Sequence, residues 1–189
     1  MLHRVHRSDF SYAQFNPCLG GSTRFAPIQD TSGNCVHSLY AGATLRAAIH
    51  ETIFHDIPAN ADRKSVPRQS ITDRSHSVLK IERKLKLVEL RSVTLSPWGL
   101  SRNELISSSP RHYAQTALWA QAIHHCDAAA DGLVWTSNQC DPDDAYLFFG
   151  DRVSSADFSL VMSRDGATNI LFLEDVVHEG WERGVVVTV

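Results

Sequence analysis

The chain has 189 residues and a mass of 21.0 kDa, and its 18 lysines and arginines against 21 aspartates and glutamates give a net charge of −3 with neutral histidines. A chain of this length can bury a sufficient core as a single domain, without support from a metal or a disulfide. The near-neutral charge argues against a protein that coats nucleic acid or lies on an anionic membrane, because both roles need a clustered excess of Lys and Arg.

The cysteine pattern and the N-terminus bear on the compartment. The four cysteines are Cys18, Cys35, Cys126 and Cys140. None forms a C-x-x-C pair or has the cysteine–histidine spacing of a zinc site, so we expect reduced thiols and no metal. The N-terminus lacks the apolar stretch of a secretory signal, and every apolar run is far shorter than the about 20 residues that cross a bilayer. These features favour a cytoplasmic protein.

The first part of the chain predicts a loop, a short strand and a helix. Residues up to about 33 are rich in Gly, Pro, Asn and Ser, which is typical of structured loops. Residues 36–41 alternate like a strand, and Thr44 then offers an N-cap to a helix. Helical spacing places one apolar stripe on that helix: Leu45, Ala48, Ile49, Thr52 and Ile53. Asp56, Pro58 and Asn60 end it, and the polar residues 60–74 predict an exposed loop.

The rest of the chain is rich in predicted strands. Two are expected at residues 77–81 and 84–90, before a turn at residues 97–99. Ser109 and Pro110 then begin a helix that reaches Cys126. Further strands are expected at residues 133–136, 145–149, 158–162, 169–173 and 185–189. Trp119 and Trp135 are interpreted as core aromatics. Strands outnumber helices and do not alternate with them, which favours an α+β fold over a doubly wound sheet.

Common catalytic motifs are mostly absent. His50 and His55 flank a glutamate, but their i, i+5 spacing turns the two rings to different faces of a helix, so a metalloprotease site is not expected. Neither a P-loop nor a G-x-G-x-x-G turn occurs. Ser137 lacks a G-x-S-x-G context and by itself indicates a turn at a strand end.

Glu51 is the carboxylate that stands out. It lies within the predicted helix among the small neighbours Ala47, Ala48 and Thr52. A glutamate at such a position points either to solvent or into a cleft with a purpose. The spacing alone does not decide between the two.

A set of segments resembles a known family. They are GGSTRFAP, LYAGATLRAAIHET, YAQTALWAQAIHHCDAAADGLVWTS and YLFFGDRV, and they follow one another over about residues 4–153. This ordered combination closely resembles the RES family, which is named for Arg, Glu and Ser. The strongest matches are the Leu39–Tyr40 pair, the Ala-rich helix ending in Glu51, and the strand from Asp131 to Ser137.

The resemblance implies a fold and an activity. RES proteins look like ADP-ribosyltransferase-type α+β folds that break the glycosidic bond between nicotinamide and ribose in NAD⁺. Many are bacterial toxins paired with an Xre-like helix-turn-helix antitoxin. NAD⁺ is then a substrate, no cofactor is tightly bound, and water or inorganic phosphate is the acceptor. One alternative is transfer of ADP-ribose to a protein, and another is an inactive RES-like domain that only binds its partner.

The resemblance also assigns roles to residues of this chain. The catalytic set is Glu51, Arg24 and Ser137. The substrate-binding set is Tyr40, Arg4 and Phe25. Glu51 would stabilise the ribosyl cation, and Ser137 would orient the ligand. Either Arg24 or Arg4 would clamp the phosphates, and Tyr40 would pack against nicotinamide or its ribose.

The resemblance also suggests partners. We expect an antitoxin that covers the cleft near Arg24 and Glu51. The chain has no recognisable helix-turn-helix of its own, so direct contact with nucleic acid is not expected, and neither is contact with a membrane. The sequence leaves open whether the chain forms a homo-oligomer.

Overall fold

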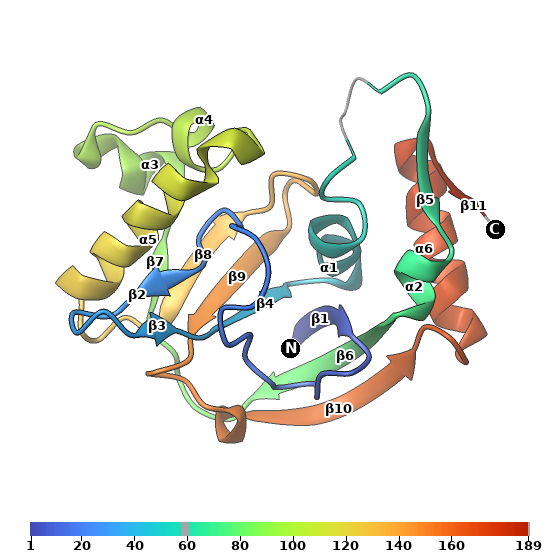
Figure 1. Cartoon of the computed structure of the whole chain (residues 1–189), viewed down its shortest axis with the longest axis horizontal. Coiled ribbons are helices and arrows are strands. Elements are labelled where there is room, and N and C mark those ends of the chain that lie inside the picture. Colours follow the sequence, from blue (N-terminus) through green and yellow to red (C-terminus); the bar gives the residue numbers. More distant parts are fainter. Residues whose placement is uncertain (58–60, 189) are drawn as a thin grey trace.

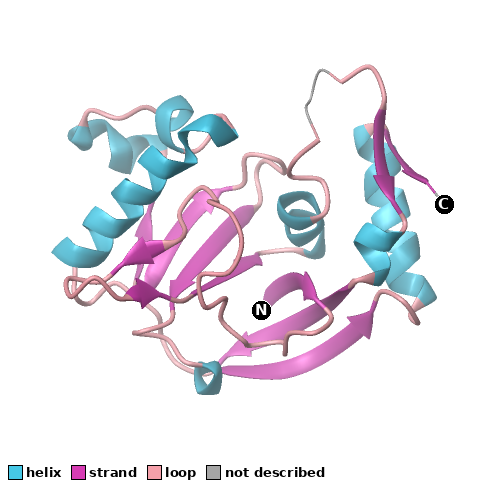
Figure 2. Ribbon diagram, in the orientation of Figure 1, coloured by secondary structure: helices cyan, strands magenta, loops and turns pink. Residues whose placement is uncertain are grey.

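The computed structural model describes residues 1–57 and 61–188. A seven-stranded sheet forms the centre of the molecule (Figures 1 and 2). In spatial order the strands are β10 (Phe158–Asp165), β6 (Arg74–Ile81), β1 (Leu2–Arg7), β4 (Ser38–Gly42), β9 (Asp144–Phe149), β8 (Gly132–Thr136) and β7 (Leu87–Glu89). Neighbouring strands are antiparallel except for the parallel β7–β8 pair. This arrangement confirms the predicted α+β class.

Helices gather at the two ends of this sheet. They are α1 (Leu45–Thr52), α2 (Gln69–Thr72), α3 (Ser92–Leu95), α4 (Arg102–Leu105), α5 (Tyr113–Cys126) and α6 (Ile170–Arg183). In Figure 1, α3, α4 and α5 lie at one end, α2 and α6 lie at the other, and α1 lies between the two groups. Two strand pairs complete the fold: β2 (Ile28–Gln29) with β3 (Cys35–Val36), and β5 (Lys64–Pro67) with β11 (Val185–Thr188). None of the described helices is long and apolar enough to span a membrane.

A separate apolar cluster stabilises each end of the molecule. Around α5, Ala117, Ala120 and Ile123 pack with side chains of β8 and β9. Around α1, Ile49 and Phe54 pack with Phe172 and Val176 of α6. The buried residues of α5 recur at three- and four-residue spacing, as on one face of a helix: Thr116, Ala117, Ala120, Ile123 and His124. These clusters fix α1 and α5 on the same sheet, and the space between the two helices becomes the site described below.

The start of α1 follows the sequence prediction closely. The Thr44 side chain accepts a hydrogen bond from the backbone N–H of Ala47 at 3.0 Å, as an N-cap does. Gly42, at the end of β4, lets the helix approach the strand, because a Cβ there would lie 2.8 Å from the backbone nitrogen of Ala48. The helix ends at Thr52 with Ile53 as C-cap. Pro58 and Asn60, which were expected to help end it, lie outside the described residues, as does Val189 at the end of the last predicted strand.

The exposed loop predicted for residues 60–74 is wrong over most of its length. The chain there forms β5 and then the single turn of α2. The four residues of β5 are Lys, Ser, Val and Pro, and only Val66 is buried. This composition resembles that of a polar loop. Its strand structure comes from parallel pairing with β11, about 120 residues later in the chain, which no local pattern reveals.

The strand predicted at residues 169–173 is also wrong, because α6 begins there. The Asn169 side chain caps the helix by accepting from the N–H of Phe172 at 3.0 Å. Phe172, Val176 and Gly180 form its buried face at a spacing of four. A short apolar run fits a strand or a helix equally well. Here the Asn169 cap and the four-residue spacing of the buried side chains indicate a helix.

Two further expectations need correction. Cys18 and Cys35 are joined by a disulfide, with Cα atoms 6.5 Å apart, so only Cys126 and Cys140 are free thiols. The pairing connects the loop before β2 to β3 and therefore depends on the fold of that segment. Trp135 is buried as predicted, but Trp119 is partly exposed and stacks on Trp98 with ring centroids 6.4 Å apart.

Candidate functional site

A cavity of about 620 Å³ lies between α1 and the start of α5, with β1 and β4 as its floor. This volume is within the range of about 300–1,000 Å³ that is typical of small-molecule sites. The charged side chains in its wall are Arg4, Arg7, Arg24, Arg74, Glu51 and Asp56. Arginines outnumber carboxylates in that set, so the wall carries a net positive charge, which suits an anionic ligand.

Glu51 faces this cavity from the last turn of α1. Its Oε1 accepts two hydrogen bonds, from the hydroxyl of Ser137 at 2.5 Å and from the backbone N–H of Asn138 at 3.1 Å. Within residues 1–57 and 61–188, no group donates to Oε2. The carboxylate is therefore oriented by one oxygen, while the other is left for a ligand. The structure thus answers the question that spacing left open: Glu51 points into a cleft.

Ser137 lies behind Glu51, at the end of β8, and is completely buried. Its hydroxyl donates to Glu51 and accepts from the N–H groups of Gln139 at 3.1 Å and Cys140 at 2.9 Å. One donated and two accepted bonds use the full capacity of a hydroxyl. Ser137 was expected to orient the ligand, but it is not in the cavity wall. Its position is that of a support for Glu51.

Replacing Ser137 with alanine is expected to lower the free energy of unfolding by about 1–3 kcal/mol, because two backbone N–H groups lose their acceptor and Oε1 of Glu51 loses one of its two donors. Urea denaturation measures this. Ser65→Ala is the matched control, because Ser65 is exposed on β5. Equal stability of the two variants would show that the network around Ser137 contributes nothing to folding.

Arg24 and Arg4 both reach the cavity, and both are buried, with 8% and 6% exposure. Nη1 of Arg24 donates to the hydroxyl of Ser108 at 3.0 Å and to its carbonyl at 3.2 Å, and the guanidinium lies 5.1 Å from the ring centroid of Tyr113. Arg4 donates to the carbonyls of Tyr12 and Gln14, both at 2.7 Å. Burial lowers the pKa of Arg4 to about 10. Arg4 therefore remains cationic at neutral pH.

The two arginines share a further property. Within the part of the chain that the structure describes, neither forms an ion pair with a carboxylate, although arginines elsewhere do, such as Arg91 with Asp144 at 2.8 Å. Buried charges in folded proteins are generally paired. One cavity therefore holds two buried guanidinium groups that form no ion pair with a carboxylate of the described residues, and such a cavity suits an anionic ligand.

Tyr40 lies in the cavity wall and Phe25 does not. The Tyr40 hydroxyl is 2.8 Å from the Thr23 hydroxyl and accepts from the N–H of Phe25 at 3.2 Å, and burial raises its pKa to about 12. It therefore remains a neutral phenol. Phe25 is completely buried and packs edge-on against Trp135, with centroids 4.9 Å apart. The structure thus places Phe25 in the core beneath the site and not beside a ligand.

Several cavity residues were not predicted. Tyr113 lies at the start of α5, and its ring packs against the guanidinium of Arg24. Trp135 was assigned to the core and also reaches the wall. Gln139 contributes from the loop after Ser137. The sequence pointed to Gln139 only through its position two residues after Ser137. No local pattern indicated that Tyr113 or Trp135 would line a cavity.

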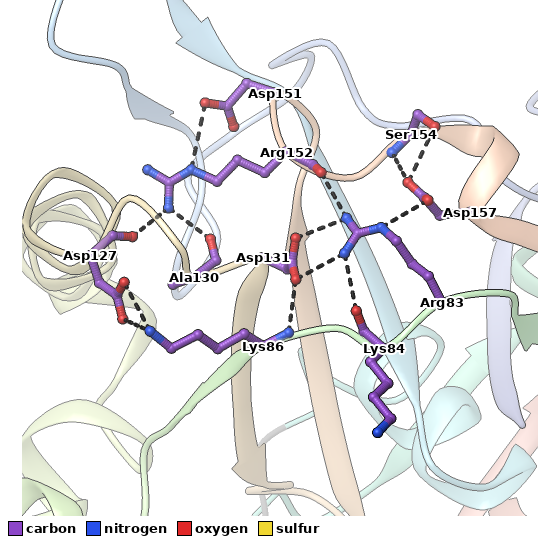
Figure 3. Close-up of polar contacts among 10 residues, drawn as sticks. All are labelled: Arg83, Lys84, Lys86, Asp127, Ala130, Asp131, Asp151, Arg152, Ser154 and Asp157. Atoms are coloured by element: carbon purple, nitrogen blue, oxygen red, sulfur yellow. Dashed lines mark hydrogen bonds and ion pairs between the residues drawn. The ribbon is translucent and has the colours of Figure 1, made fainter.

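Asp131, which contributes to the family resemblance, lies outside the cavity wall. Figure 3 shows it between Arg83 and Lys86 at the start of β8. Arg83 donates to both carboxylate oxygens, at 2.8 and 3.1 Å, and the Lys86 backbone N–H donates at 2.8 Å. The hydrogen bonds from Arg83 lower the pKa of Asp131 below its ordinary value. Asp131 therefore fixes the beginning of the strand that ends in Ser137.

Comparisons with known proteins identify the family and the fold. A model of the RES domain matches residues 1–165. A comparison with curated proteins gives no match. Among solved structures, the chain is similar to one from the crystal structure of the M. tuberculosis MbcT–MbcA toxin–antitoxin complex, with a TM-score of 0.60 and 13% sequence identity, over 92% of this chain and 86% of the other. At this identity the likeness concerns the fold alone.

Proposed function

The chain belongs to the RES-domain family, and we propose that it is the toxin of a toxin–antitoxin pair and cleaves the bond between nicotinamide and ribose in NAD⁺. One observation supports the proposal: two buried arginines, which have no carboxylate partner among residues 1–57 and 61–188, share a cavity with a carboxylate that has one oxygen available. Arginines of this kind fit the pyrophosphate of a dinucleotide. A fixed carboxylate fits a ribose that becomes positively charged.

Of the two arginines, Arg24 is the better phosphate ligand. Arg4 makes two short bonds of 2.7 Å to loop carbonyls, and these hold the loop before β2 against β1. The bonds of Arg24 are longer, from 3.0 to 3.5 Å, so a phosphate oxygen can replace them more easily. We therefore assign the phosphate contact to Arg24 and a loop-holding role to Arg4.

Glu51 acts on the ribose. As the bond from C1′ to the nicotinamide nitrogen breaks, its electron pair moves to the pyridinium ring, which leaves as neutral nicotinamide, and positive charge develops on the ribose. The free Oε2 of Glu51 stabilises that charge, which is present in the transition state and much weaker in bound NAD⁺. Water or inorganic phosphate then forms the new bond to C1′, and water loses a proton in doing so.

Tyr40 provides a surface for the nicotinamide. Its ring lies in the wall, and its hydroxyl is fixed by Thr23 and by the N–H of Phe25. An aromatic face attracts the cationic pyridinium ring more strongly than the neutral product. This difference favours binding of NAD⁺ and release of nicotinamide.

An Xre-like antitoxin is the partner that we propose, covering the cavity near Arg24 and Glu51. The fold likeness to a toxin from a toxin–antitoxin complex supports a partner of this kind. An acidic or C-terminal carboxylate group on the antitoxin would match the positive wall of the cavity. A purified complex that turned over NAD⁺ as fast as the free chain would contradict this placement.

Product analysis tests the reaction. Purified protein is incubated with NAD⁺ in the presence and absence of inorganic phosphate, and the products are separated by chromatography. We expect free nicotinamide together with ADP-ribose, or with phosphorylated ADP-ribose where phosphate is the acceptor. ADP-ribose found only attached to a protein would show that the chain modifies proteins and does not release ADP-ribose. Unchanged NAD⁺ would show that the chain is a binding domain without this activity.

A further inference from the structure

A polar cluster connects α6 to the loop that carries Ser137. Nη2 of Arg183, in the last turn of α6, donates to Oε1 of Gln139 at 2.5 Å and to the carbonyl of Ile57 at 3.4 Å. Nη1 of Arg183 lies 3.3 Å from Nδ1 of His50. On the other side of that ring, Nε2 of His50 lies 3.3 Å from Oε2 of Glu179. The end of α6 thus contacts both the helix that holds Glu51 and the loop that follows Ser137.

This cluster depends on close packing of α6 against the end of α1. Gly180 makes the approach feasible, because a Cβ there would lie 2.9 Å from the carbonyl oxygen of Val185 and 3.4 Å from the ring of Phe54. The whole of α6 lies beyond residues 1–165, which the RES model matches. The contact therefore brings a segment outside the matched region to the candidate site.

Gln139 connects this cluster to the carboxylate. Its side chain takes part in the cavity wall, and its backbone N–H donates to the Ser137 hydroxyl at 3.1 Å. The same hydroxyl donates to Glu51, and the N–H of Asn138 donates to the same Glu51 oxygen. A shift of the Gln139 side chain would therefore move the two groups that orient Glu51.

Arg183 resembles Arg4 and Arg24 in lacking a carboxylate ion pair within the described residues. Burial lowers the pKa of Arg183, and the nearby negative charge of Glu51 opposes that shift. A side chain used only for packing would need neither the charge nor the hydrogen bond to Gln139.

We propose that Arg183 is a positioning residue, which fixes the loop of residues 137–139 through Gln139 and thereby holds Glu51 in its reactive orientation. This inference rests on the proposed NAD⁺ cleavage and deepens it. Arg183 is not one of the residues that line the cavity, so its loss affects the geometry of the site and leaves the binding groups in place.

The kinetic test uses four variants and one control. Arg183→Ala is expected to lower kcat and kcat/KM for NAD⁺ cleavage equally, by about tenfold or more, because a small displacement of a reacting group is costly. Arg183→Lys restores part of the loss. Gln139→Ala shows a similar loss, and the double variant Arg183→Ala with Gln139→Ala is no worse than the poorer single one. Glu182→Ala, an exposed change on the same turn, behaves like the wild type.

A second measurement does not depend on activity. Hydrogen exchange of the Asn138 and Gln139 amides is expected to be faster in Arg183→Ala than in the wild type, and unchanged in Glu182→Ala. Failure of the wild type to consume NAD⁺ would overturn the proposed function. The amide exchange would then still test whether Arg183 positions the loop. Wild-type kcat in Arg183→Ala, additive losses in the double variant, or unchanged amide exchange would overturn the inference.

Discussion

Replacement of Glu51 by glutamine is expected to reduce kcat for NAD⁺ cleavage by about a hundredfold to a thousandfold, the range found when a group that stabilises transition-state charge is removed. Glutamine has nearly the same shape, and its amide oxygen can still accept from Ser137 and from the N–H of Asn138. The amide nitrogen then takes the place of Oε2 in the cavity, so the negative charge is lost while the fold and the cavity are kept.

Two controls separate loss of charge from loss of structure. The thermal unfolding midpoint of Glu51→Gln should be close to that of the wild type, and NAD⁺ should still bind in isothermal titration. Glu174→Gln removes an exposed carboxylate from α6, and it should cleave NAD⁺ at the wild-type rate. A Glu51→Gln protein that folds, binds and cleaves normally would remove Glu51 from the mechanism.

Arg24→Ala is expected to raise KM for NAD⁺ by about tenfold to a hundredfold, because a charge-assisted hydrogen bond is worth about 1.5–3 kcal/mol. The guanidinium lies in the cavity wall and has no carboxylate partner in the described chain, so its positive charge is available to phosphate. Steady-state kinetics with varied NAD⁺ concentration measures the effect. Arg24→Lys keeps the charge but loses the planar fork, and it should restore only part of the affinity.

Arg4→Ala is the informative comparison for this prediction. Because Arg4 holds the carbonyls of Tyr12 and Gln14, its removal should mainly lower the unfolding midpoint, and it should change KM less than Arg24→Ala does. The reverse pattern, with KM raised mainly by Arg4→Ala, would assign the phosphate contact to Arg4.

Local signals in the sequence were sufficient for the part of the fold that carries the carboxylate. Thr44 and the apolar stripe predicted α1, and the structure has the cap and buries Ala48, Ile49 and Ile53, while Leu45 and Thr52 of the stripe are half-buried. The strand that ends before Ser137 was also predicted and is present as β8. Chain-local periodicity and capping determine these elements, because they are built from contacts within a few residues.

The remaining features depend on contacts between distant segments. β5 is a strand because β11 pairs with it, and the disulfide forms because β3 lies beside the loop that contains Cys18. The role of Ser137 as a support for Glu51 joins residues 86 positions apart. Periodicity contains no information on such pairs, so it could not show which of the predicted site residues line the cavity and which lie behind it.

The time course of NAD⁺ concentration with purified wild-type protein beside Glu51→Gln tests the central claim most directly. The wild type should consume NAD⁺ and release one nicotinamide for each molecule consumed, and the variant should leave it nearly unchanged over the same period. Stable NAD⁺ with the folded wild type, or equal consumption by both proteins, would contradict the assignment of this cavity and of Glu51 to NAD⁺ cleavage.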